Sequence, residues 1–232
     1  MFARLRLLGE AACDSVVAEV LHHRARWARR GTGEFYTFGA ASYLDEAEAY
    51  ERRAGELNPL LLARFAPLYA CLRERLAQTL DAPVELAEGK AVPGFHVWGV
   101  PGIPTGAHAS LHFDLQYQRL RWPAELRAGP VRALSFTLPL RLPRAGGGLS
   151  LWDVTHDRVA AFCVRAGFRG TLEDMLPLFE ERHEAYAPGE LVVHSGHVLH
   201  RIAPVPRVEP DDLRLTLQGH ALWLGGAWQL YW

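Results

Sequence analysis

From about residue 90 onward, the sequence is a series of short apolar runs separated by glycine and proline. Many short strands at close intervals are typical of a β-sandwich or barrel of the jelly-roll type. We therefore predict a fold that is mainly β with some α, built on a jelly-roll or cupin-like core. The runs that we expect to form strands are 95–100, 110–116, 131–140, 149–154, 159–164, 191–194 and 213–224.

The chain before this region has a largely helical pattern. Its apolar residues recur at helical spacing, and Pro67 is expected to bend or divide the longest helix. We expect these helices to buttress one sheet, so that 1–88 supports a β core over 89–232 within a single domain. The expected elements are a strand over 2–8 and helices over 10–30, 45–56 and 58–80.

An aromatic, glycine-containing segment over 34–45 lies between the first two helices. It predicts a strand or a structured loop. Because aromatic side chains dominate protein cores, we expect Phe35, Phe38 and Tyr43 to pack inside. The alternative is that they line a pocket.

Charge and hydropathy exclude several classes of partner. The 232 residues include 25 basic and 26 acidic side chains, which gives no electrostatic basis for binding nucleic acid or an anionic membrane. No apolar run is long enough to span a bilayer. The expectation is a cytoplasmic enzyme or binding protein.

The tripeptide His112-Phe113-Asp114 is the first candidate for chemistry. In a strand, alternate residues share a face, so the imidazole and the carboxylate would project together. Two such side chains on a stiff backbone can bind the same metal ion. A metal site would need a third ligand from elsewhere in the chain.

Three histidines downstream are candidates for that ligand, namely His194, His197 and His200. Two histidines and one carboxylate on one side of the metal form the triad of non-haem Fe(II) oxygenases. A structural zinc site usually has four ligands and is rich in cysteine. The three cysteines are far apart in the sequence, which favours the open triad.

These residues resemble the 2-oxoglutarate- and Fe(II)-dependent oxygenases on the double-stranded β-helix. The resemblance covers roughly 90–224 and has four parts in the family's order. They are His112-Phe-Asp114 as the His-X-Asp motif, Gly146-Gly-Gly-Leu as the following hairpin, His200-Arg-Ile-Ala-Pro-Val as the distal histidine segment, and Arg214-Leu-Thr216 as the Arg-X-Ser/Thr pair.

The resemblance implies that His112, Asp114 and His200 bind Fe(II), with His197 as the fallback for the distal ligand. It also implies that Arg214 and Thr216 bind the distal carboxylate of the cosubstrate 2-oxoglutarate. An arginine that points into a barrel needs a counter-charge, which a dicarboxylate supplies through two parallel hydrogen bonds.

The activity implied is hydroxylation of an unactivated C–H bond by O2, with succinate and CO2 as co-products. The substrate expected is a small molecule, an amino acid, or a peptide- or carrier-bound residue. Two alternatives stay open: another cupin-like metal enzyme that does not use 2-oxoglutarate, and a non-catalytic barrel that acts as a sensor or interaction protein.

Several other residues are weaker candidates. His194 is expected in the core, with a substrate-facing role as the alternative. Four arginines after the metal motif are expected to be solvated, although they could meet an acidic group on a substrate: Arg119, Arg121, Arg127 and Arg132. The remaining pocket candidates are His108, Ser110, Gln116, Trp98, Trp152 and His220.

Overall fold

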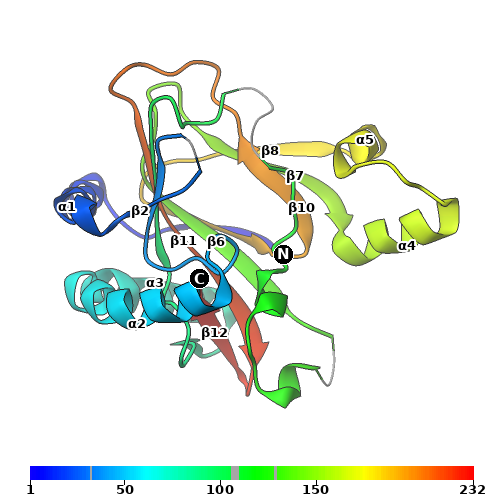
Figure 1. Ribbon diagram of the computed structural model, residues 1–232, viewed down its shortest axis with the longest axis horizontal. Helices are drawn as coiled ribbons and strands as arrows, with labels where there is room; N and C mark the ends of the chain where they lie inside the picture. The colour runs from blue at the N-terminus through cyan, green and yellow to red at the C-terminus, as the bar shows by residue number, and fades with distance from the viewer. Residues whose placement is uncertain (32, 106–109, 128–129) are drawn as a thin grey trace.

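Two β-sheets face each other in the computed structural model, which describes residues 1–31, 33–105, 110–127 and 130–232. Within these residues a nine-stranded main sheet faces a three-stranded second sheet (Figure 1). The main sheet contains β1 (Phe2–Arg6), β2 (Ala28–Arg29), β3 (Phe35–Phe38), β4 (Val84–Leu86), β5 (Gly94–Gly99), β6 (Ala133–Arg141), β9 (Glu190–Ser195), β11 (Leu213–Leu224) and β12 (Ala227–Tyr231). The second sheet contains β7 (Gly148–Thr155), β8 (Glu181–Ala185) and β10 (Val198–Ala203).

Strand β11 is the axis of the main sheet. It pairs antiparallel with β5 on one side and with β6 on the other. Side chains alternate along β11. Leu215 and Leu217 enter the apolar core under the helices, and Arg214 and Thr216 are on the other face, which is turned toward the second sheet. One strand therefore supplies both core packing and polar groups for the interior between the sheets.

Three helices cover the outer face of the main sheet. They are α1 (Glu10–His22), α2 (Ala47–Arg64) and α3 (Ala66–Leu80). Their buried side chains, among them Val20, Leu61 and Leu72, share one apolar cluster with Leu138 and Leu215 of the sheet. In Figure 1 these helices lie on one side of the main sheet and β7, β8 and β10 on the other. The predicted buttressing of one sheet by N-terminal helices is confirmed.

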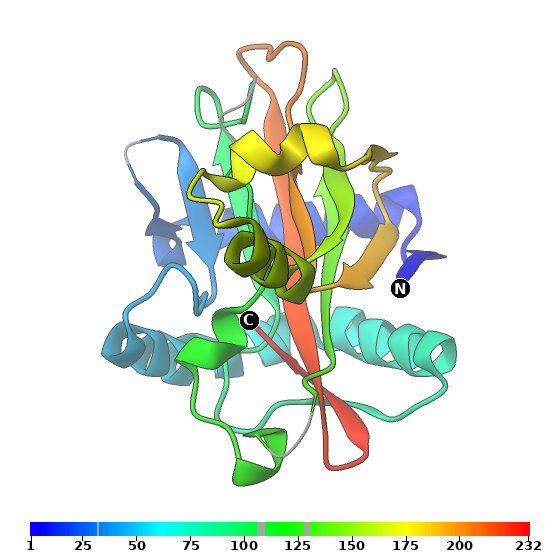
Figure 2. The ribbon, with the colours of Figure 1, turned by 90° about the vertical axis from the view of Figure 1, so that its right-hand side faces the viewer.

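Two further helices lie in the sequence between β7 and β8 of the second sheet. Helix α4 (His156–Ala166) and helix α5 (Leu172–Met175) pack on the outer side of the second sheet, where Val159 and Met175 join a cluster with Trp152. Figure 2 shows them in front of the two sheets. The remaining 3-10 turns are η1 (Arg24–Arg26), η3 (Gln116–Arg119), η4 (Ala124–Arg127) and η5 (Leu176–Leu178).

Two predicted strands are wrong. Residues 159–164 belong to α4, because Val159, Phe162 and Cys163 recur at helical rather than alternating spacing and pack on one side. Residues 110–116 do not form a regular strand. The segment makes one isolated antiparallel bridge, between His112 and His200, before it turns into η3.

The N-terminal helix boundaries also differ from the prediction. The first helix ends at His22 rather than near residue 30, and the helices predicted over 45–56 and from Asn58 are one continuous helix, α2. Asn58 does not begin a helix, because its side chain is engaged by the backbone of Lys90 and Val92. Pro67 lies at the start of α3 and separates it from α2, as expected.

Residues 1–88 contribute strands as well as helices. Strands β1, β2, β3 and β4 all belong to the main sheet, which makes the support part and the β core hard to separate. The single-domain organisation stays a prediction, and this shared sheet favours it. Among the described residues, no helix has both the length and the hydropathy needed to cross a bilayer.

A buried ion pair anchors the segment that follows β3. The Arg30 guanidinium donates to both carboxylate oxygens of Asp45, at 2.6 and 2.9 Å, and also to Thr37 Oγ1. The Ala41 backbone N–H donates to the same carboxylate. Burial alone would raise the pKa of Asp45, but these hydrogen bonds outweigh it and hold the pKa below its ordinary value.

Asp45→Asn is expected to lower the free energy of unfolding by about 3 kcal/mol at neutral pH, because it leaves Arg30 buried without its counter-charge. The native pKa of Asp45 is depressed, so this contribution is present at neutral pH and is lost as the pH falls below about 4. Urea unfolding at several pH values measures it. Asp14→Asn, at an exposed pair with Arg141, is the control and should change little. An equal loss in both variants at neutral pH would contradict the prediction.

Candidate metal centre

Three side chains from separate parts of the chain converge between the sheets. One ligand atom from each of His112, Asp114 and His200 lies within 4.8 Å of the other two. The Nε2 atom of His200 is 3.2 Å from Asp114 Oδ2, and the Nε2 atom of His112 is 3.6 Å from Asp114 Oδ1. The structure thus brings together the set that the sequence resemblance implied.

Backbone hydrogen bonds fix this convergence. The N–H of His112 donates to the carbonyl of His200, and the N–H of His200 donates back, each at 3.0 Å. This reciprocal pair places the two imidazole rings 4.4 Å apart. The N–H of Asp114 donates to Gly196 at the turn between β9 and β10, so the third side chain is held against the same hairpin.

The two histidines share one arrangement of their ring nitrogens. Nδ1 of His112 is 2.8 Å from the carbonyl oxygen of Ser110, and Nδ1 of His200 is 2.8 Å from that of Val198. A carbonyl oxygen only accepts, so each neutral ring carries its proton on Nδ1. The lone pair of each Nε2 is left for the interior, which is the state in which imidazole binds a metal.

The electrostatics of the cluster also fit a cation. Asp114 is 9% exposed, and among the described residues no lysine or arginine contacts its carboxylate. Burial raises its pKa, but the neighbouring histidines outweigh this and hold it well below the ordinary value. The carboxylate is therefore buried and ionised. A divalent cation within reach of all three side chains would balance it.

The other two histidines of the distal segment are placed differently. His197 lies in the turn between β9 and β10, with its Nε2 3.3 Å from the Tyr117 hydroxyl, and it is not part of the cluster. His194 is buried on β9 beside the His200 ring and lines the cavity described below. Burial lowers the pKa of His194 to about 3, so this ring is neutral.

Arg214 is the most unusual charged group of the interior. It is 1% exposed and points into the space between the sheets, with its Cζ 5.9 Å from the Tyr186 ring. Its three guanidinium nitrogens have no hydrogen-bond partner among the described residues. A buried cation without a counter-charge costs several kcal/mol. The site is thus suited to an anion that contacts Arg214.

Thr216, which the resemblance paired with Arg214, is fully buried on the same face of β11. Its Oγ1 accepts a 3.4 Å hydrogen bond from Gln218. It does not line the cavity, whereas Gln218 does.

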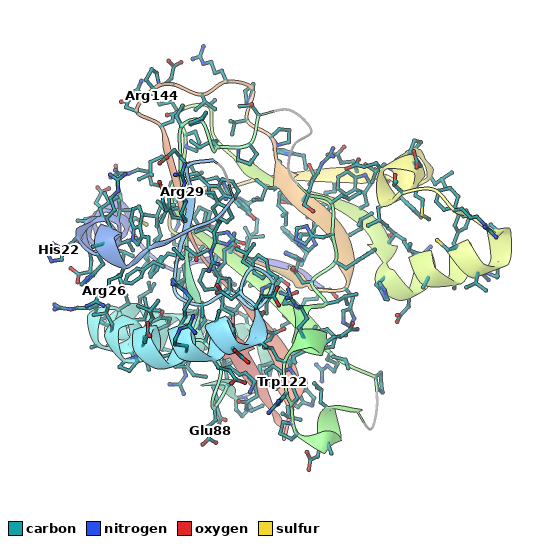
Figure 3. The ribbon with its side chains drawn as sticks, viewed as in Figure 1. His22, Arg26, Arg29, Glu88, Trp122 and Arg144 are labelled. Carbon is teal, nitrogen blue, oxygen red and sulfur yellow. The ribbon has the colours of Figure 1, made fainter. Side chains whose placement is uncertain are left out.

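A cavity of about 1020 Å³ connects these groups, large enough for a cosubstrate together with a small substrate. The metal cluster and Arg214 both line it. Figure 3 shows side chains from the two facing sheets extending into the space between them. The side chains of Asp114 and His200 are largely buried, at 11% and 6% exposed, which limits competition by water for these two ligands.

The N-terminal half supplies one wall of this cavity. Phe35 and Tyr43 line it, and the Phe35 ring stacks on Trp98 at 3.6 Å between centroids. The expectation that all three aromatics of 34–45 pack inside is correct for Phe38, whereas Phe35 lines the cavity and Tyr43 both lines the cavity and packs against a buried apolar cluster. The pocket alternative holds for Phe35 because it lies three positions before Phe38 on β3, so the two rings take opposite faces of the strand. Tyr43 follows β3, and its hydroxyl reaches His96 on the cavity wall.

His96 was missed by sequence reasoning. It is buried on β5, and its Nε2 is 2.6 Å from the Tyr43 hydroxyl. Its Nδ1 and the Nε1 of Trp98 have no partner among the described residues, and both residues line the cavity. The available signal was the alternation of β5, where Phe95 and Val97 enter the core and the residues between them face inward.

The weaker candidates divide clearly. Those that line the cavity are Trp98, Ser110, Gln116, Arg119, His194 and His220. Trp152 packs in the core on the second sheet. Arg132 stacks on Trp223 and Trp228 away from the cavity. His108 and the side chain of Arg127 lie outside the described residues.

The whole chain is similar to known proteins in its fold. No protein-family model matches it, and no curated protein matches it. Solved structures do. An N-substituted L-amino acid dioxygenase from Burkholderia ambifaria AMMD has a TM-score of 0.60 at 15% identity, covering 99% of this chain and 85% of that chain.

The non-haem α-ketoglutarate-dependent epimerase SnoN from nogalamycin biosynthesis has a TM-score of 0.52 at 14% identity, over 95% of this chain and 79% of that chain. EvdO2 from Micromonospora carbonacea var. aurantiaca, in complex with 2-oxoglutarate, has a TM-score of 0.50 at 21% identity, over 94% of this chain and 84% of that chain. This chain has the fold of the 2-oxoglutarate-dependent oxygenases. The predicted jelly-roll core is confirmed.

His200→Ala is expected to weaken Co(II) or Fe(II) binding by more than about 100-fold, because loss of even an outer partner of a metal ligand costs about 10- to 100-fold. His197→Ala should leave metal affinity close to that of the wild type. Anaerobic calorimetric titration measures both. The reverse order of effects would assign the distal position to His197.

Proposed function

We propose that this protein is a non-haem Fe(II)- and 2-oxoglutarate-dependent dioxygenase that hydroxylates an unactivated C–H bond of a small molecule, an amino acid, or a peptide- or carrier-bound residue. The observation that carries the proposal is the uncompensated Arg214, buried in the same cavity as the converging His112, Asp114 and His200. The dioxygenases of the same fold are consistent with it.

Each group has a defined role in this proposal. His112, Asp114 and His200 would hold the iron through two imidazole nitrogens and one carboxylate oxygen, leaving its other side open to the cavity. When bound, iron together with 2-oxoglutarate and O2 supplies the oxidising power for C–H cleavage, with succinate and CO2 as co-products.

Arg214 would pair with the distal carboxylate of 2-oxoglutarate through its planar fork of donors. Tyr186 and Leu149 line the cavity near that end, and Phe35 and Trp98 form the aromatic wall. Apolar walls exclude bulk water, which strengthens the charge pair and limits side reactions. The role of Thr216 in holding the same carboxylate stays part of the proposal.

SnoN, which shares the fold, is described as an epimerase. The fold alone therefore does not decide the reaction class. Hydroxylation is the outcome proposed because the candidate site offers three protein ligands and an open face. The alternatives, a metal enzyme that does not use 2-oxoglutarate and a non-catalytic barrel, are separated by the two experiments below.

Anaerobic addition of Fe(II) and then 2-oxoglutarate is expected to produce the visible metal-to-ligand charge-transfer absorption. Asp114→Ala should abolish the band, since it removes the single carboxylate of the cluster. Metal binding without the band in the wild type would overturn the proposal. A band without succinate formation over a broad substrate panel would favour the sensor alternative.

Arg214→Gln should weaken the binding of 2-oxoglutarate roughly 10- to 150-fold, which is the loss of affinity expected when hydrogen bonds to a charged group are removed. The ligand-free variant should be at least as stable as ligand-free wild type, because a buried unpaired charge is removed. Titration of the band and thermal unfolding measure the two effects. Arg141→Gln, at an exposed arginine paired with Asp14, is the matched control. Unchanged 2-oxoglutarate affinity in Arg214→Gln would point to an enzyme that does not use this cosubstrate.

A further inference from the structure

One arginine at the cavity has no assigned role. Arg119 ends η3, five residues after Asp114, and its exposed side chain lines the cavity. Among the described residues its guanidinium has no hydrogen bond, ion pair or aromatic partner. Some other arginines of this chain are engaged by carboxylates, such as Arg30 by Asp45 and Arg144, labelled in Figure 3, by Asp211. Arg119 is therefore a free cation at the entrance to the candidate active site.

The charge of the cavity wall is one-sided. Of the described residues that line it, Asp114 is the single carboxylate, while Arg119 and Arg214 are both cationic. The undescribed residues 106–109, next to the lining residues Thr105 and Ser110, read Gly-Ala-His-Ala and add no carboxylate. A cationic substrate would meet no counter-charge here, since Asp114 faces the metal position.

The remaining charges cancel when the proposed function is assumed. A divalent metal and Arg214 are positive, and Asp114 and the dianion 2-oxoglutarate balance them. Arg119 alone is left over. Field lines in a cavity with low-dielectric walls are focused, so one unbalanced cation attracts an anionic ligand to this entrance.

Apart from the metal cluster, Arg119 and Arg214, the described wall is uncharged. Part of it is apolar, and Gln116 and Gln118, on the same turn as Arg119, are polar but neutral. Phe35, Leu44, Trp98 and Ile103 line the cavity, and the Phe35 and Trp98 rings are stacked within 7° of parallel. Such walls bind an apolar or flat body and supply no ionic contact of their own. A ligand that fits both the apolar wall and the Arg119 guanidinium has an apolar body and one anionic end.

We propose that Arg119 binds a carboxylate of the substrate, so that the substrate class is a small monocarboxylate with an apolar or aromatic body. The planar fork of an arginine matches a carboxylate and orients it, which would aim one end of the molecule at Arg119 and the other toward the metal. This inference rests on the proposed function, because Arg214 is taken to be occupied by 2-oxoglutarate.

The test compares matched probes on the anaerobic enzyme saturated with Fe(II) and 2-oxoglutarate. The probes are 3-phenylpropanoate with 3-phenylpropanamide, and N-acetyl-L-phenylalanine with its carboxamide. Calorimetry and perturbation of the charge-transfer band measure binding. Wild type is expected to bind the carboxylates at least about tenfold more tightly than the amides, as a hydrogen-bonded charge pair requires.

Arg119→Gln should remove this preference and Arg119→Lys should restore part of it. Arg121→Gln is the matched control, since Arg121 is exposed two residues further on and does not line the cavity. It should keep the preference. Thermal unfolding checks that all variants are folded.

The inference is overturned if wild type shows no carboxylate preference or binds no carboxylate probe, or if Arg119→Gln keeps the preference. Equal loss in Arg121→Gln would also overturn it, because the effect would then be a diffuse field rather than a contact. Failure of the proposed function is a separate result, since it is seen before any probe is added as absence of the charge-transfer band in wild type.

Discussion

The reciprocal pair of backbone hydrogen bonds between His112 and His200 is the constraint on which the candidate centre depends. The segment that contains His112 is not a regular strand, so no continuous ladder holds it in place. These two bonds, with the Asp114-to-Gly196 bond, fix it to the β9–β10 hairpin. Because the same two residues supply the imidazoles, the backbone contact sets the distance between the side chains directly. Three backbone hydrogen bonds are therefore enough to position the three side chains, without a continuous β-ladder.

The interior between the sheets is held in an electrostatically costly state. Asp114 is ionised and buried among histidines, and Arg214 is buried with no counter-charge among the described residues. The stability needed to maintain both comes from elsewhere, from the apolar layer between the main sheet and α1, α2 and α3. Polar groups that lack partners in the ligand-free protein are ready to bind without reorganisation, which is how binding sites gain affinity from stability provided by the rest of the fold.

The N-terminal region does more than support the sheet. Strand β3 and the segment held by the Arg30–Asp45 pair place Phe35 and Tyr43 on the wall of the cavity. Tyr43 in turn contacts His96 on the neighbouring part of that wall. The shape of the cavity therefore depends on residues that lie far before the metal motif in the sequence. Differences in this region would be expected to alter substrate choice without altering the metal ligands.

The sequence by itself determined the jelly-roll class, the N-terminal helical layer and the residues that converge, because these depend on local periodicity and on motifs with fixed internal spacing. It could not decide where 110–116 leaves the sheet or that 159–164 is helical, since short apolar runs fit either period until packing selects one. The motif context favoured His200 and kept His197 as the fallback, but it could not show which ring faces inward, because that depends on the geometry of the turn between β9 and β10. Only the tertiary structure decided these points, and only it showed that His96 faces the cavity and that Arg119 meets it without a partner. Burial and charge balance are properties of surfaces assembled from distant segments, and no local pattern contains them.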